Sequence, residues 1–158
     1  MDTARVQWMD KGRFIAQSPS GHLAALDSDR ASNGAPRPME LLPIVLGACT
    51  ATDIVSIFAK KRQKLDSLEV EVSGERSENS PRVWTKLEIL YKLRGALEET
   101  AEQHAIQLSE GEYCSVAAML GKTAAISSRV EIDTHSTGSP CSNQRGHHTR
   151  LVSLHLIA

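Results

Sequence analysis

Two of the three cysteines, Cys49 and Cys114, lie in mostly apolar stretches that are 65 positions apart (114 − 49). A pair of thiols can carry out redox chemistry, in which one sulfur attacks a peroxide and the other converts the resulting sulfenic acid to a disulfide. The attacking sulfur must be a thiolate, which a neighbouring cation or a helix N-terminus stabilises. The alternative is that each cysteine is a small core side chain without chemistry, because free cysteine is among the most buried residue types.

Asp53 interrupts the apolar stretch of Cys49, four positions further along the chain. On a helix this spacing places both side chains on one face. A carboxylate there disfavours a thiolate unless an arginine intervenes, because like charges repel. Asp53 can equally be a polar residue that binds backbone groups or water near the helix end, and both interpretations stay open.

Four histidines and the third cysteine lie near the C-terminus, where they resemble a set of metal ligands. Their spacing matches no standard zinc pattern, and the Ser, Gly, Pro and Asn residues around them are typical of a solvated tail. We therefore expect no metal and no cofactor. The residues concerned are His135, Cys141, His147, His148 and His155.

The overall composition argues against several classes of function. A formal net charge of −1 and an aromatic content of 4% favour neither nucleic acid nor an anionic membrane surface as a partner. The charge-free part of the longest apolar run has only about a dozen residues, which is too few to span a bilayer. An odd number of cysteines argues against a secreted disulfide framework. We expect a cytoplasmic protein with no membrane partner.

Residues 38–64 form the stretch around which the rest of the chain is expected to fold. Almost every side chain from Leu41 to Ala51 is apolar, and a helix that is apolar on all sides is buried on all sides. Pro38 suits the first turn of a helix, whereas Pro43 is expected to bend the helix or delay its regular start. We therefore predict a long buried central helix that carries the first cysteine.

Alternating and helical patterns define the remaining elements. Period-2 alternation over short runs predicts strands, and apolar residues three or four positions apart predict helices. A capping box formed by Ser109 and Glu112 is expected to begin the helix that carries Cys114. Together the patterns predict an α+β fold. The predicted strands are residues 4–8, 13–17, 22–26, 68–73, 83–93 and 126–132, and the further predicted helices are residues 95–108 and 113–122.

The chain is expected to form one domain over residues 1–134, followed by a polar tail with an apolar end over residues 135–158. A length of 158 residues is sufficient for a sizeable core. Residues 134–148 are rich in Ser, Gly, Pro, His and Asn, which is typical of a linker. Residues 151–158 are apolar again, so they are expected to add a strand or to pack on a partner.

Two cysteine-containing motifs resemble those of the OsmC/Ohr family. Residues 38–41 (Pro-Met-Glu-Leu) are followed by residues 47–49 (Gly-Ala-Cys), and residues 113–117 (Tyr-Cys-Ser-Val-Ala) form the second motif. The order of the predicted elements also matches the family, and the likeness covers about residues 4 to 134. Residues 20–22 (Ser-Gly-His) and 53–56 (Asp-Ile-Val-Ser) are similar to a branch of small, poorly characterised OsmC-like proteins.

The resemblance implies an OsmC/Ohr-like α+β fold with antiparallel sheets and a long buried central helix, assembled as an intertwined homodimer. It also implies a stress-response protein that reduces organic hydroperoxides through a Cys49–Cys114 disulfide, in which Cys49 attacks and Cys114 resolves. An organic hydroperoxide and a dithiol reductant would then be its further partners. In the family's peroxidases an arginine and a glutamate complete the site, which lies at the subunit interface.

The chain departs from the family pattern at the glutamate, which in the family directly follows the motif proline. This chain has Met39 at that position. Glu40 is the nearest substitute, although one position along a helix turns a side chain by about 100°. Arg30 is the best positional candidate for the arginine, followed by Arg13 and Arg37. The alternative function is therefore a non-peroxidase protein of the same fold that binds a small apolar or electrophilic ligand.

Overall fold

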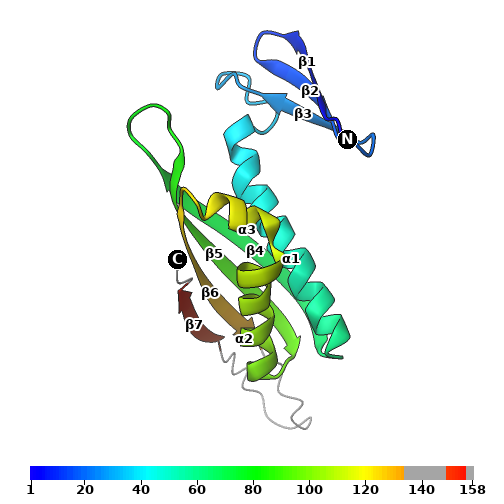
Figure 1. The fold of residues 1–158 in the computed structure, drawn as a ribbon, viewed down its shortest axis with the longest axis vertical. Coiled ribbons are helices and arrows are strands. Elements are labelled where there is room, and N and C mark those ends of the chain that lie inside the picture. Colours follow the sequence, from blue (N-terminus) through cyan, green and yellow to red (C-terminus); the bar gives the residue numbers. More distant parts are fainter. Residues whose placement is uncertain (134–148, 156–158) are drawn as a thin grey trace, which may run out of the picture. The chain divides into compact units, whose positions relative to one another are not determined.

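The computed structural model describes residues 1–133 and 149–155 of the 158-residue chain. The chain divides into two compact units, Met1–Ile44 and Val45–Ala158. The first unit contains a three-stranded sheet, and the second contains a four-stranded sheet with helices (Figure 1).

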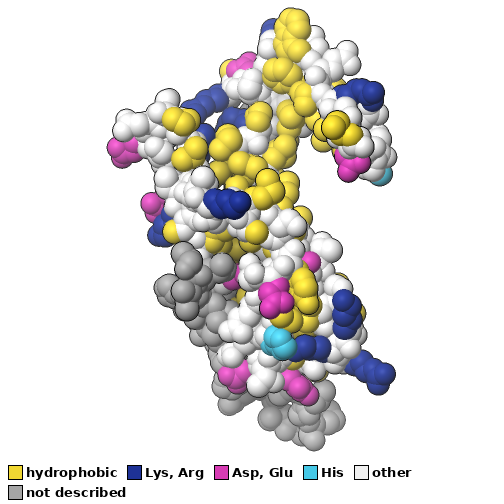
Figure 2. Space-filling view, viewed as in Figure 1, with side chains coloured by type: hydrophobic (Ala, Val, Ile, Leu, Met, Phe, Trp, Pro, Cys, Tyr) yellow, Lys and Arg dark blue, Asp and Glu magenta, His cyan; other side chains and the backbone are white. Residues whose placement is uncertain are grey.

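The sheet of the first unit is the antiparallel meander that the sequence predicts. Its strands β1 (Arg5–Asp10), β2 (Arg13–Gln17) and β3 (Leu23–Asp27) pair in that order. Lys11 has a positive φ of 44° in the tight turn between β1 and β2. Large apolar side chains of this unit, including Val6 and Trp8, remain exposed, and Figure 2 shows such hydrophobic side chains on its surface.

The buried carboxylate of Asp27 organises the loop that follows β3. It accepts backbone N–H bonds from Asp29 (2.9 Å) and Gly34 (3.0 Å), and a bond from the hydroxyl of Ser32. These bonds, that of Ser32 first, hold the pKa of Asp27 below its ordinary value. The polar loop that follows β3 is therefore folded around the carboxylate of Asp27.

The central helix begins with a 3-10 turn, η1 (Pro38–Glu40), and continues as α1 (Leu41–Lys60). Because the regular helix starts at Leu41, Pro43 lies in its first turn, where a missing N–H breaks no helical hydrogen bond. This is the delayed start that the sequence predicts.

The four-stranded sheet of the second unit has the order β4-β5-β6-β7. β4 (Lys64–Arg76) and β5 (Trp84–Ala96) form the long antiparallel hairpin that the alternation predicts. β6 (Ala125–Asp133) pairs in parallel with β5, because a helical connection returns the chain in the same direction. The expectation of antiparallel sheets is therefore wrong for this sheet, which is mixed. β7 (Thr149–His155) adds an antiparallel strand beside β6. This agrees with the first of the two expectations for the apolar end of the chain, that it adds a strand.

Apolar side chains of the sheet and the helices form the core of the second unit. Alternate residues of β5 point inward, as its period-2 pattern predicts, and α1 and the segments between β5 and β6 cover them. The largest fully buried apolar side chains are Leu46, Ile54, Phe58, Leu87, Ile89, Tyr91, Leu93 and Ile106.

The prediction that α1 is buried on all sides is wrong for the single chain. Leu46, Ile54 and Phe58 pack into the core, whereas Val45 and Val55 remain 45% and 48% exposed. One sheet covers one face of a helix, so the remaining apolar face needs another cover. By length and composition alone, Pro38–Lys60 would also suffice to cross a membrane, a test that core helices of soluble proteins pass as well.

The connection between β5 and β6 consists of α2 (Glu99–Leu108), a π-helical turn η2 (Ser109–Tyr113) and α3 (Ser115–Leu120). The predicted capping box is therefore wrong. Ser109 has helical φ and ψ of −60° and −54°, and the N-cap of α3 is Cys114. The Cys114 N–H donates to the carbonyl of Ser109 at 2.7 Å, so the chain stays helical through Ser109. Such π-helical turns are frequent at functional sites.

Candidate active site

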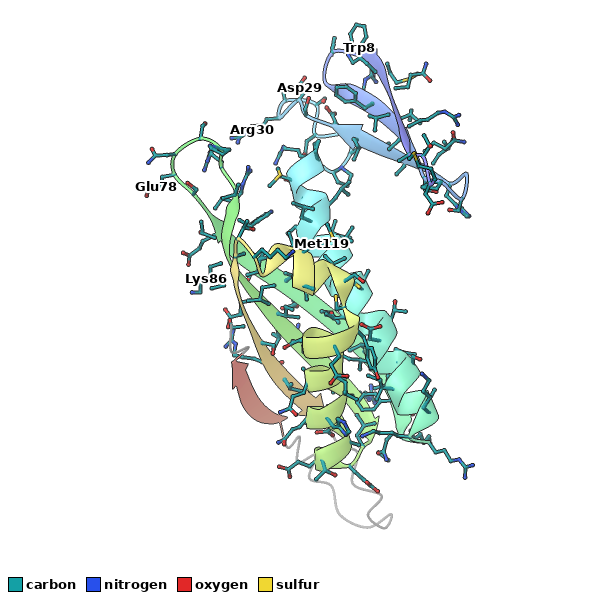
Figure 3. All side chains as sticks on the ribbon, viewed as in Figure 1. Trp8, Asp29, Arg30, Glu78, Lys86 and Met119 are labelled. Carbon is teal, nitrogen blue, oxygen red and sulfur yellow. The ribbon has the colours of Figure 1, made fainter. Side chains whose placement is uncertain are left out.

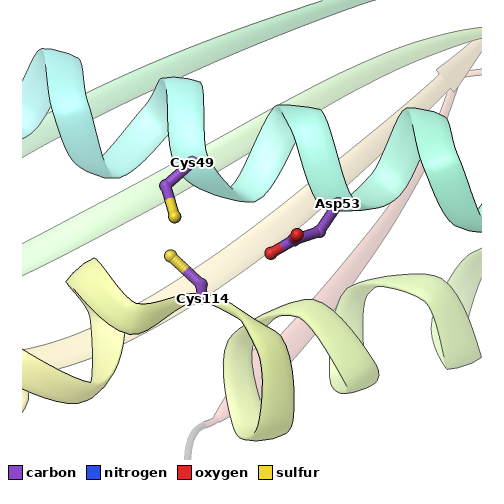
Figure 4. A group of neighbouring side chains, drawn as sticks. All are labelled: Cys49, Asp53 and Cys114. Carbon is purple, nitrogen blue, oxygen red and sulfur yellow. The ribbon is translucent and has the colours of Figure 1, made fainter. Parts of the chain in front are cut away.

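The two cysteines of the predicted redox pair come together in the second unit, with Asp53 beside them (Figure 4). The sulfur atoms of Cys49 and Cys114 and a carboxylate oxygen of Asp53 all lie within 4.8 Å of one another. Both cysteines are free thiols. Two sulfurs separated by 65 positions of sequence therefore meet between α1 and the junction of η2 with α3.

Helix α1 places Cys49 and Asp53 side by side, since residues four positions apart are neighbours on a helix. The interpretation of Asp53 as a residue that faces Cys49 is confirmed. Cys49 is partly buried and packs against the core cluster. Of the two cysteines, Cys49 is therefore the less buried residue.

Cys114 is held at the junction of η2 and α3. Its side chain is 2% exposed, and its sulfur accepts a hydrogen bond from the backbone N–H of Ala117 at 3.4 Å. Burial first, and then the hydrogen bond with Cys49, raise the pKa of the Cys114 thiol to about 12. Cys114 is therefore a protonated thiol at neutral pH.

Ser109 holds the carboxylate of Asp53 in place. Its hydroxyl donates to Oδ2 of Asp53 at 3.1 Å, and the carbonyl oxygen of Thr50, at 3.4 Å, is its alternative acceptor. Ser109 is fully buried, so its hydroxyl needs such a partner. Sequence reasoning missed this role because a serine followed three residues later by a glutamate has the pattern of a helix N-cap.

A second buried polar cluster, formed by Tyr91, Glu110 and Ser128, adjoins Cys114. The hydroxyl of Tyr91 donates to Oε1 of Glu110 at 2.8 Å, and that of Ser128 donates to Oε2 at 3.1 Å. Burial raises the pKa of Glu110, and these two bonds oppose that shift in part. The pKa of Tyr91 is raised by burial first, then by the charge of Glu110, and a charge on Cys114 raises it as well.

Sequence reasoning missed this polar cluster as well. Its one signal was the inward position of Tyr91 in the alternation of β5, since the hydroxyl of a buried tyrosine requires a partner. The carboxylate of Glu110 could not be found in this way, because a glutamate in a helical segment is normally exposed.

The other predicted site residues lie in the first unit. Arg30 is exposed in the loop after β3 (Figure 3), and Arg13 pairs with an aspartate at the end of β1. Glu40 pairs with Arg37 through the guanidinium and the backbone N–H of that arginine. The assignment of Arg30 and Glu40 to the thiol site stays a prediction. Outside the described residues lie His135, Cys141, His147, His148 and the side chain of His155.

Comparison with known proteins identifies the family. The sequence profile described as "OsmC-like protein" matches residues 31–129. Protein YhfA of Escherichia coli K12 is 38% identical over 130 residues, which are 82% of this chain and 96% of that protein. The structure of an OsmC-like protein from Mycoplasma pneumoniae matches with a TM-score of 0.75 at 17% identity, covering 85% of this chain and 98% of that chain.

A more distant structure is that of an organic hydroperoxide resistance protein OsmC from Legionella pneumophila. It has a TM-score of 0.59 and 13% identity, and the match covers 81% of this chain and 94% of that chain. The chain therefore belongs to the OsmC-like protein family, and the predicted α+β fold of the OsmC/Ohr type is confirmed. Cys49 and Cys114 both lie within the matched residues.

Proposed function

We propose that this protein is a thiol-dependent peroxidase that reduces organic hydroperoxides through a disulfide between Cys49 and Cys114. The observation that supports this most strongly is the convergence of the two sulfurs within 4.8 Å. Small side-chain rotations can close such a separation to a disulfide bond of about 2.05 Å. Family membership and the fold shared with a hydroperoxide resistance protein support the same class of activity.

The proposed cycle has three steps. The Cys49 thiolate attacks one peroxide oxygen of ROOH, the O–O bond breaks, and the sulfur is oxidised to a sulfenic acid while the alkoxide takes a proton and leaves as ROH. The Cys114 sulfur then attacks the Cys49 sulfur, and the sulfenic hydroxyl leaves as water with the Cys114 proton. An external dithiol reduces the disulfide by exchange and is itself oxidised to a disulfide.

The surroundings of the two thiols support this division of roles. Cys49 is partly exposed and can meet a substrate, whereas Cys114 is 2% exposed and reaches only a neighbour. The Cys114 thiol carries its proton beside the sulfur of Cys49, within 4.8 Å of it. The same proton is in position to leave with the hydroxide in the second step.

The proposal includes an intertwined homodimer in the cytoplasm that acts in the stress response. Within the second unit, an open groove of about 700 Å³ runs between α1 and β4. A second copy of the chain would cover its apolar wall and the exposed valines of α1, which one sheet leaves uncovered. The apolar lining residues are Ala48, Ala51, Val55, Leu65, Leu68 and Val70.

A second candidate function is binding of a small apolar or electrophilic ligand without peroxidase turnover. Two observations favour it. The carboxylate of Asp53 lies beside both sulfurs, where its negative charge opposes a thiolate. Glu40, the substitute for the family's glutamate, is already paired with Arg37.

The test is consumption of cumene hydroperoxide by the full-length protein with a dithiol reductant. Wild type and the Cys141→Ser variant, which keeps the proposed pair, should turn over equally. Cys49→Ser should be inactive, and Cys114→Ser should lose turnover while Cys49 accumulates as sulfinic acid, measured by mass spectrometry. No consumption by wild type, with a folded protein by circular dichroism, would favour the second function; equal activity of wild type and Cys49→Ser would exclude a role for the thiol.

A further inference from the structure

We infer that the reduced protein binds one zinc ion between the sulfurs of Cys49 and Cys114 and the carboxylate of Asp53. This site was not expected from the sequence, where the spacing of the C-terminal histidines and Cys141 argued against a metal. It does not depend on the proposed peroxidase activity, because it requires only that the three side chains meet in the reduced state. Figure 4 shows all three directed into the space between α1 and the start of α3.

The three donor atoms suit zinc by type. Thiolate sulfur is a soft ligand that selects zinc and other thiophilic metals over magnesium or calcium, and zinc also accepts a carboxylate oxygen. Two sulfurs and one oxygen leave the fourth tetrahedral position for water. Cys49 is partly exposed, which provides a route for the ion and the water.

The distances suit zinc as well. With Zn–S bonds of about 2.3 Å and a Zn–O bond of about 2.0 Å, tetrahedral angles place the two sulfurs about 3.8 Å apart and each sulfur about 3.5 Å from the oxygen. In the structure all three atoms lie within 4.8 Å of one another. The side chains therefore need to close by no more than about 1.3 Å, which small changes of side-chain torsion provide.

Neighbouring groups already orient two of the three ligands. The hydroxyl of Ser109 donates to Oδ2 of Asp53, which leaves the other oxygen for a metal. The N–H of Ala117 donates to the sulfur of Cys114. Hydrogen bonds of this kind fix ligand orientation in metal sites and contribute to affinity.

Zinc binding and disulfide formation exclude each other at this site. Zn²⁺ displaces the two thiol protons to solvent and holds both sulfurs as thiolates, so neither is free to attack a peroxide or to form the S–S bond. Conversely, an oxidant that joins the sulfurs removes two of the three ligands and releases the ion. Bound zinc should therefore protect the two thiols from oxidation, and oxidation of the two thiols should release the zinc ion.

The experiment titrates Zn²⁺ into reduced, chelator-treated, full-length protein under anaerobic conditions, against a chromophoric zinc chelator. Wild type and Cys141→Ser should each bind one ion per chain. Cys49→Ser and Cys114→Ser should lose this binding, and Asp53→Asn, which keeps the shape of the side chain, should weaken it by about tenfold or more. Co²⁺ in place of Zn²⁺ should produce thiolate charge-transfer absorption and the visible bands of a tetrahedral ion in wild type.

Oxidation of the wild-type protein provides a second test, which needs no substitution and therefore does not depend on whether a variant folds. Diamide treatment should release the ion stoichiometrically, and dithiol reduction should restore binding, because only the sulfur ligands change. Retention of one ion after both cysteines are oxidised, equal binding by Cys49→Ser, or loss of binding in Cys141→Ser would each overturn the assignment. Absence of peroxidase turnover would not, since the zinc measurement contains no peroxide.

Discussion

Oxidation of the Cys49–Cys114 pair is expected to stabilise the protein against unfolding by about 4 kcal/mol. The bond would close a loop of 65 positions (114 − 49), and the loss of chain entropy in the unfolded state of such a loop corresponds to about 4 kcal/mol at 25 °C. The folded state needs little rearrangement, because the two sulfurs already lie within 4.8 Å in one unit. For a chain of this size, about 4 kcal/mol corresponds to a rise in Tm of about 8 to 16 °C.

The assay is urea unfolding of reduced protein and of protein treated with one equivalent of cumene hydroperoxide. Peptide mapping under non-reducing conditions shows which cysteines are joined. Cys141→Ser should reproduce the stabilisation, Cys114→Ser should abolish it, and a dithiol should reverse it in wild type. These controls separate the intramolecular bond from any effect of oxidation elsewhere.

The reasoning would be refuted if the Cys49–Cys114 bond forms and the free energy of unfolding stays constant or falls. That result would mean that the folded state must distort to bring the sulfurs together, against their observed proximity. A disulfide found only between chains, or only with Cys141, would refute it too, because the two sulfurs would then not be neighbours in solution.

Three further results are expected. Tyr91→Phe removes the hydroxyl that donates to the buried carboxylate of Glu110, so urea unfolding should show a loss of about 1.5 to 3 kcal/mol; the control Tyr113→Phe, at an exposed side chain, should change stability by less than about 0.5 kcal/mol. The loss of stability in Tyr91→Phe should be smaller at acid pH. Burial raises the folded-state pKa of Glu110, so the contribution of Glu110 to stability is fully present below its unfolded-state pKa and is lost as the pH rises through its folded-state pKa. Removing the bond from Tyr91, which lowers that folded-state pKa, makes this loss of stability with rising pH larger. A difference that does not vary between about pH 4 and pH 8 would mean that Glu110 stays in one protonation state. Gly95→Ala should lower the free energy of unfolding by more than about 1 kcal/mol, because φ at this residue is +151° and a Cβ would lie 2.2 Å from a backbone oxygen of β4. Gly111→Ala is the matched control, since nothing lies within 4 Å of its added Cβ. Equal effects of the two substitutions would refute the argument.

Much of the fold could be predicted because the relevant signals are local. The alternation of Leu87, Ile89, Tyr91 and Leu93 records which face of β5 is inside, and the structure buries all four. The position of Pro43 predicts that the regular part of α1 begins late, and the structure begins α1 at Leu41. Each signal depends only on residues within one strand or one helical turn, so a short window of sequence contains it.

The sequence by itself identified the two candidate cysteines, the position of Asp53 one helical turn after Cys49, and the resemblance to the OsmC/Ohr family. Only the tertiary structure decided that Cys114 meets them from the end of a π-helical turn, and that the serine expected to cap a helix binds Asp53 instead. The physical reason is that the helical pattern around Ser109 fits either backbone conformation, and the choice between them depends on side chains of α1 that lie more than 50 positions earlier in the chain. Contacts over such separations arise from the packing of the whole unit, which no local pattern records.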